Sequence, residues 1–142
     1  MKLANEGTAG ATSYFGSQYP HLAFGGGENY WRGTINQYPA YIWMGFPKAH
    51  RLAMISVKTG DNWQISFSSS NIDIVGSDDC IRWTDLLNIA SWKNSYNSRM
   101  WDIPPENRAS FHCIGIRWPP HKTEYERTYA GPIWKIVMWE EI

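Results

Sequence analysis

The sequence predicts an all-β fold, and three observations lead to this class. Several short segments alternate apolar and polar residues with the period of two that is typical of strands with one buried face. Clusters of Gly, Ser, Asn, Asp and Pro separate them, and no segment of useful length has the period of a helix. The alternating segments are 41–46, 52–58, 71–75, 111–118 and 133–139. Without helices to connect parallel strands, they favour an antiparallel β-sandwich.

The alternation also predicts which side chains face the core. Each segment contributes apolar residues two positions apart, which place their side chains on one face of a strand. A shorter strand is expected over 100–103, and residues 65–70 are expected to form a short strand or an extended edge. The predicted inward residues are Ile42, Met44, Phe46, Ile55, Val57, Ile114, Ile116, Trp118, Trp134, Ile136 and Met138.

The segment from Asn71 to Leu87 organises the rest of the chain. Ile72 and Ile74 alternate with polar neighbours, and the turn sequence Gly-Ser-Asp-Asp follows at residues 76–79. Gly is suited to positive φ in such a turn, and Ser and Asp side chains bond back to the local backbone. We expect Trp83 and the two leucines after it to return the chain to the core.

This segment resembles the discoidin domains, also called F5/8 type C or galactose-binding-like domains, in which it reads "f-x-i-x-G-S-x-D-x-x-x-W-t-x-L". Other parts of the chain follow the same family order. The matching stretches are 3–13, 23–33, 41–48, 111–118 and 133–139. The resemblance covers nearly the whole chain. It implies a single domain over residues 1–142 with an eight-stranded antiparallel jelly-roll sandwich, and ligand-binding loops at one end.

The resemblance also implies which loops would hold a ligand. Sugar-binding relatives use a basic residue, an Asp or Asn, and an aromatic ring from these loops, because hydroxyl pairs bond to the polar groups and a ring covers the C–H face. Three loops are candidates: the first carries Arg32, the second carries Lys58, Asp61, Asn62 and Trp63, and the third carries His121, Tyr125, Arg127 and Tyr129. The alternative is ordinary polar turns, with Trp63 packed into the core. The predicted ligand-binding residues are Arg32, Lys58, Asp61, Asn62, Trp63 and Tyr129.

No cofactor is predicted, and calcium is the one candidate that the resemblance raises. Gly25 and Lys135 stand where calcium-binding relatives carry Asp and Glu. Because calcium needs several oxygen ligands, including carboxylates, we expect no tight site, although Glu28 and backbone carbonyls could contribute. By the order of the family, Cys80 and Cys113 are expected to form a disulfide. The alternative is two free, buried thiols.

Composition and motifs favour recognition over catalysis. The formal net charge is zero, so no nucleic-acid partner is expected. Nine Trp and eight Tyr exceed what one core of this size needs, which indicates a recognition surface. The four histidines have no metal-ligand spacing, no G-x-S-x-G motif occurs, and the adjacent Glu140 and Glu141 would point to opposite faces of a strand. No enzymatic activity is therefore predicted.

The leading functional hypothesis is a non-catalytic module that binds a glycan or glycoconjugate, of galactose type or another. One alternative is a cell-adhesion domain that binds a cell-surface protein or phospholipid, and another is an accessory domain of a larger protein. The resemblance implies an extracellular or cell-surface location, as part of a larger or processed protein. No N-terminal apolar stretch resembles a signal peptide, so a cytoplasmic protein is the alternative. The oligomeric state is left open.

Overall fold

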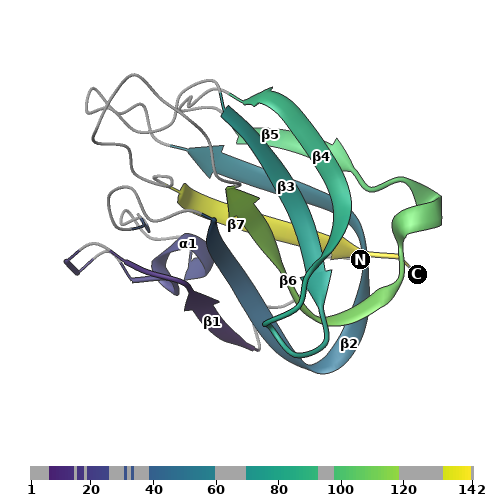
Figure 1. Cartoon of the computed structure of the whole chain (residues 1–142), viewed down its shortest axis with the longest axis horizontal. Helices are drawn as coiled ribbons and strands as arrows, with labels where there is room; N and C mark the ends of the chain where they lie inside the picture. Colours follow the sequence, from purple (N-terminus) through teal and green to yellow (C-terminus); the bar gives the residue numbers. More distant parts are fainter. Residues whose placement is uncertain are drawn as a thin grey trace.

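The structure is a computed structural model, and it describes most of the strands and the turns between them (Figure 1). The described residues are 7–14, 16–17, 19–25, 31, 33, 39–59, 70–92, 98–118 and 133–141. The elements, in chain order, are β1 (Thr8–Ala11), α1 (Leu22–Gly25), β2 (Ala40–Thr59), β3 (Ser70–Ser77), β4 (Thr84–Trp92), β5 (Ser98–Asp102), the 3-10 helix η1 (Pro105–Asn107), β6 (Ser110–Trp118) and β7 (Ile133–Glu140).

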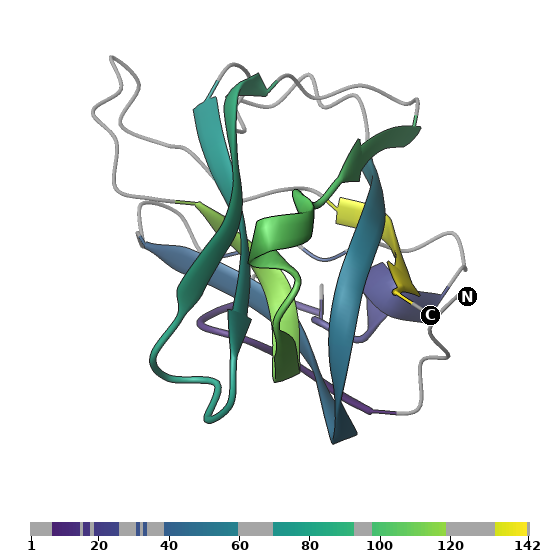
Figure 2. The ribbon, with the colours of Figure 1, turned by 90° about the vertical axis from the view of Figure 1, so that its right-hand side faces the viewer.

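Two antiparallel layers share one long strand. The large sheet has the order β1-β2-β6-β3-β4, and the small sheet pairs the second half of β2 with β5 on one edge and β7 on the other. The two halves of β2 diverge from a bend at one end of the molecule (Figure 2). This arrangement is an antiparallel β-sandwich, so the predicted all-β jelly-roll class is confirmed.

The described residues form seven strands, whereas eight were predicted, and β2 accounts for the difference. The sequence predicts separate strands over 41–46 and 52–58. In the structure the chain stays extended between them, and the pairing with β6 shifts its register between Gly45 and His50. Pro47 lies in this interval and has no N–H to donate to a ladder. The bend therefore passes the chain from one sheet to the other without ending the strand.

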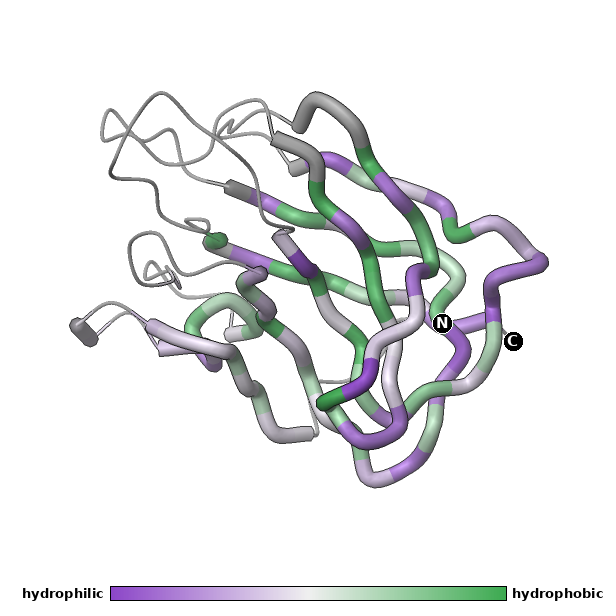
Figure 3. The backbone as a smooth tube through the Cα atoms, viewed as in Figure 1, coloured by the Kyte–Doolittle hydropathy of each residue, from purple (hydrophilic) through white to green (hydrophobic). Residues whose placement is uncertain are grey.

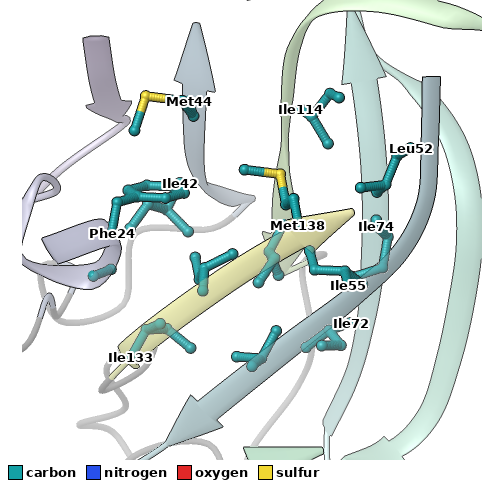
Figure 4. Packing of buried hydrophobic residues seen from close by; sticks show 14 of the residues in the cluster. Phe24, Ile42, Met44, Leu52, Ile55, Ile72, Ile74, Ile114, Ile133 and Met138 are labelled. Carbon is teal, nitrogen blue, oxygen red and sulfur yellow. The ribbon is translucent and has the colours of Figure 1, made fainter. Parts of the chain in front are cut away.

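The core lies between the two sheets, and the predicted inward faces line it. Hydropathy alternates along the strands (Figure 3), and side chains from β2, β3, β6 and β7 meet in one cluster (Figure 4). Of the predicted inward residues, all whose side chains the structure describes are buried. The side chain of Trp134 lies outside the described residues. The cluster includes Ile42, Met44, Phe46, Ile55, Val57, Ile114, Ile116, Trp118, Ile136 and Met138.

The turn between β3 and β4 is held by its own side chains. Ser77 Oγ accepts hydrogen bonds from the amides of Asp79 and Cys80, at 3.3 and 3.0 Å, and donates one to Asp79 Oδ1 at 2.9 Å. Asp79 Oδ1 also accepts from the amides of Ile81 and Arg82 at 2.9 and 2.8 Å. These bonds, first that from Arg82, lower the pKa of Asp79 below its ordinary value.

Two expectations for this region are wrong. The positive φ falls on Cys80, at 59°, and Gly76 has no positive φ. Gly76 is required for another reason, since a Cβ there would lie 2.4 Å from the Phe111 ring. Trp83 does not enter the core. It lies half-buried on the outer face of the large sheet, where its ring packs against Tyr41 and Trp43 with centroids 5.2 and 5.6 Å apart.

A disulfide ties the turn to the large sheet. The structure joins Cys80 to Cys113 of β6, with their Cα atoms 5.6 Å apart. Cys113 faces outward from the sheet, opposite Gly45 and Ser77 on the neighbouring strands.

Among the described residues, no helix is both long enough and apolar enough to cross a membrane.

Candidate ligand-binding site

The predicted ligand loops leave the sandwich from strand ends that lie together. Thr59 at the end of β2 is paired with Ile133 at the start of β7, and Ile133 forms a bridge with Trp31 through backbone bonds of 3.0 and 2.9 Å. The Trp31 ring lies 5.5 Å from that of Trp118, at the end of β6. We call the region around these four residues the loop end. It lies opposite the bend of β2 and the β3–β4 turn (Figure 1).

Trp31 anchors the loop end to the core. Its side chain is fully buried, and its Nε1 donates a 3.0 Å hydrogen bond to the carbonyl of Ser13. This bond holds the segment that follows β1 against the same end of the sandwich. Arg32, the next residue in the sequence and a predicted ligand residue, lies outside the described residues.

Lys58 is the one predicted ligand-binding residue that the structure describes. It is the penultimate residue of β2, half-buried, and its neighbour Val57 faces the core. Lys58 therefore faces outward on the small sheet, next to the loop end. Asp61, Asn62, Trp63 and Tyr129 lie outside the described residues, as do His121, Tyr125 and Arg127 of the third predicted loop.

Lys135 is a second cation that sequence reasoning did not assign to the site. It lies on β7 directly opposite Lys58 in the register of the small sheet. Like charges that face each other across strands repel. Neither lysine forms an ion pair with any residue that the structure describes. The two lysines thus provide two ammonium donors beside the loop end. A ligand rich in oxygen acceptors could accept hydrogen bonds from both.

Two exposed tyrosines next to the loop end were also missed. Tyr14 and Tyr19 follow the anchored Ser13, with 50% and 41% of their surfaces exposed, and their ring centroids lie 5.0 Å apart. His21 stacks on Tyr19 at 5.9 Å. Their sequence signal was two tyrosines within a segment rich in Gly and Ser, which has no strand pattern to mark it.

A metal site is not evident in the described part of the chain, where no three His, Cys, Asp or Glu residues gather closely enough to hold an ion. Gly25 and Lys135, which stand where calcium-binding relatives carry acidic residues, are both exposed. The expectation that this chain has no tight calcium site stays a prediction.

Comparisons with solved structures identify the fold. A family 32 carbohydrate-binding module of a family 31 glycoside hydrolase from Clostridium perfringens matches with a TM-score of 0.74 and 16% identity, over 99% of this chain and 95% of that one. A second family 32 module from Clostridium perfringens, in complex with GalNAc-β-1,3-galactose, matches with 0.76 and 11%, over 98% and 99%. An F5/8 type C domain from Bacteroides fragilis matches with 0.71 and 13%, over 99% and 95%.

No protein-family model and no curated protein sequence matches the chain. The likeness to these structures is therefore one of fold. The chain shares its jelly-roll fold with these family 32 carbohydrate-binding modules and this F5/8 type C domain.

Proposed function

We propose that this chain is a non-catalytic module that binds a glycan at the loop end of the sandwich. One observation carries the proposal: nearly the whole chain superimposes on a carbohydrate-binding module solved with GalNAc-β-1,3-galactose. The fold by itself does not choose a ligand. The loop end adds chemistry that suits a sugar, because Lys58 and Lys135 provide donors and neighbouring aromatic side chains provide apolar faces.

The predicted residues take complementary roles in this proposal. Lys58 and Arg32 donate to sugar hydroxyl oxygens, and Asp61 and Asn62 accept from hydroxyl groups. Trp63 and Tyr129 cover the C–H face of the ring. A shallow site on loops buries little of a small glycan, so we expect weak affinity for monosaccharides and stronger apparent binding to multivalent surfaces.

The disulfide supports a proposal for where the protein is located. A disulfide between Cys80 and Cys113 persists in an oxidising environment. It supports an extracellular or cell-surface module, as part of a larger or processed protein. That context also fits the glycoside hydrolase to which one of the compared modules belongs.

The test is a glycan array probed with the intact chain and with a Lys58→Ala/Asp61→Ala double variant. Loss of binding in the double variant, at an unchanged melting temperature, is expected. Lys48→Ala is the matched control, because Lys48 is an exposed lysine on the same strand at the bend. Unchanged binding in a folded double variant would move the site away from the loop end. Binding to phospholipid vesicles without binding to any glycan would favour the adhesion-domain alternative.

A further inference from the structure

The outer face of the large sheet carries a second cluster of aromatic and polar side chains, on the side of the strands that points away from the core. The register places Tyr41, Arg117, Asp73 and Asn88 in one row across β2, β6, β3 and β4. Alternate residues of the same strands, such as Ile42, Ile74 and Ile116, are buried in the core. The row therefore faces outward.

The next row along the sheet is built around Trp43. Its register neighbours are Gly10 on β1 and Gly115 on β6. A Cβ at Gly10 would lie 2.6 Å from atoms of the Trp43 ring, so the indole occupies the space above this glycine. Trp83 packs beside it and beside Tyr41. All three aromatic residues are half-buried, so each ring is packed yet keeps part of its surface in solvent.

A β-bulge adds two exposed polar side chains to this face. Ile74 is paired with Leu87 but Val75 is paired with Asp85, which leaves Leu86 as an extra residue on β4. Leu86 is buried in the core. Asp85 and Asn88, three residues apart, both end up on the outer face, where Asn88 Nδ2 donates to Asp85 Oδ2 at 3.2 Å and to Asp73 Oδ1 at 2.6 Å. Bulges commonly re-aim side chains near functional sites.

The two carboxylates of the cluster have different environments. Asp73, whose side chain is 8% exposed, receives Arg117 Nε and Nη2 at 2.9 and 2.6 Å as well as Asn88. Three hydrogen bonds occupy most of its acceptor capacity and hold both partners in place. Asp85 receives Arg117 Nη2 at 2.8 Å and keeps 43% of its side chain exposed. A carboxylate has about four acceptor sites, so Asp85 retains capacity for hydroxyl donors.

The charge of the cluster selects against acidic ligands. Two carboxylates and one guanidinium leave a formal charge of −1. Burial opposes the charge of Arg117, but hydrogen bonds to Asp73 and Tyr41 and the charges of Asp73 and Asp85 outweigh it, so the pKa of Arg117 is raised. The guanidinium stays charged and paired within the cluster. An anion would therefore meet an excess negative charge.

We infer that Tyr41, Trp43, Trp83, Asp85 and Asn88 form a second glycan-binding surface, the sheet-face site, which takes a neutral saccharide. The half-buried rings suit the apolar C–H face of a pyranose, and the exposed carboxylate and amide beside them suit its hydroxyl edge. Trp83 directly precedes β4 and packs on Tyr41 and Trp43 of the outer face, and Asp85 pairs with Arg117 on that face, so ring and acceptor are on the same side. The inference rests on the proposed function, to which it adds a site separate from the loop end.

The first experiment is an NMR titration of the ¹⁵N-labelled intact chain with GalNAc-β-1,3-galactose, galactose, and neutral gluco-, manno- and xylo-oligosaccharides. The signals to follow are the indole N–H groups of Trp43 and Trp83 and the side-chain amide of Asn88, assigned with Trp43→Phe and Trp83→Phe. At least one saccharide at millimolar concentration should shift all three together. The shifts should persist in the Lys58→Ala/Asp61→Ala variant, since that variant leaves the sheet face intact.

The second experiment measures affinity at the sheet-face site in Asp85→Ala. Loss of one hydrogen bond to a charged group should weaken this binding by about tenfold. Asp78→Ala is the matched control, because Asp78 is exposed, carries an ion pair of 3.3 Å to His112, and lies in the adjacent turn. Its binding should equal that of the unmodified chain. If the Trp83→Phe variant does not fold, Asn88→Ala is the second variant that tests the same site, because Asn88 is exposed.

The outcomes separate the two proposals. If a saccharide binds and moves loop-end signals such as the Trp31 indole, but not those of Trp43, Trp83 and Asn88, the sheet-face site is overturned and the proposed function stands. Equal weakening by Asp85→Ala and Asp78→Ala would also overturn it. If no saccharide shifts any signal and the glycan array is silent, both proposals fail.

Discussion

The inner and outer faces of the large sheet use alternating residues of the same strands, yet they pack in different ways. The inner face is apolar, and Ile42, Ile74 and Ile116 are completely buried there. The outer face combines rings, a charged network and a disulfide, and Asp73 is buried on it as part of an ion pair. Residues one position apart on the same strand are thus stabilised by different interactions. Apolar contacts stabilise the inner set, whereas ring contacts, ion pairs and a disulfide between specific cross-strand partners stabilise the outer set.

The largest expected effect compares two neighbours on β3 that are both fully buried. Ile74 belongs to the core cluster, whereas Val75 is buried on the outer face. Ile74→Ala should lower the free energy of unfolding by about 2–5 kcal/mol, since it leaves a cavity between two sheets. Val75→Ala removes less side chain and should cost about 1–2 kcal/mol. Urea unfolding measures both, and equal losses would show that the outer face packs as tightly as the core.

The disulfide tests how strongly the outer face depends on a covalent bond. Replacement of Cys80 and Cys113 by Ser opens a loop with a sequence separation of 33 residues. The chain-entropy model predicts a loss of about 3–4 kcal/mol. Urea unfolding with and without reductant measures it, and the double variant should be insensitive to reductant. Two titratable thiols in the denatured, unreduced protein would contradict the bond.

The two carboxylates around Arg117 sharpen the comparison within the outer face. Asp73→Ala leaves a half-buried guanidinium and an Asn88 amide without their main acceptor, and should cost about 2–3 kcal/mol. Asp85 is far more exposed, so Asp85→Ala should cost less than about 1 kcal/mol. Thermal or urea unfolding of the two variants side by side measures the difference. Similar losses would mean that the buried carboxylate has no special role.

The smallest expected effect concerns pH and the β3–β4 turn. The bonds to Asp79 lower its pKa in the folded state, so the ionised form stabilises the fold above the unfolded pKa of about 3.9. This contribution is lost as the pH falls below that value. Asp79→Asn should therefore destabilise the protein at neutral pH, and the gap in melting temperature to the unmodified chain should narrow as the pH falls below about 4. A gap that stays constant with pH would contradict the assignment.

Much of the fold was predictable, because burial imposes a period of two on a strand and the period is visible in the letters. The inward residues of β2, β6 and β7 follow from it. The local bonds of Ser77 and Asp79 also follow, since these side chains reach only a few residues along the chain. The sequence predicted separate strands over 41–46 and 52–58, but the structure has one strand, β2. Whether a bend ends a strand depends on cross-strand pairing, which is not visible in the sequence.

The sequence by itself determined the sandwich class and the composition of the core, since both depend on local periodicity and total apolar content. The ligand loops at one end stay a prediction, which rests on the resemblance to a known order. Only the tertiary structure decided the outer face of the large sheet. Trp83 was expected in the core and lies outside it, and Asn88 joins Asp85 only because a bulge shifts the register of β4. Cross-strand register and long-range pairing set which polar residues meet, and neither leaves a periodic trace in the sequence.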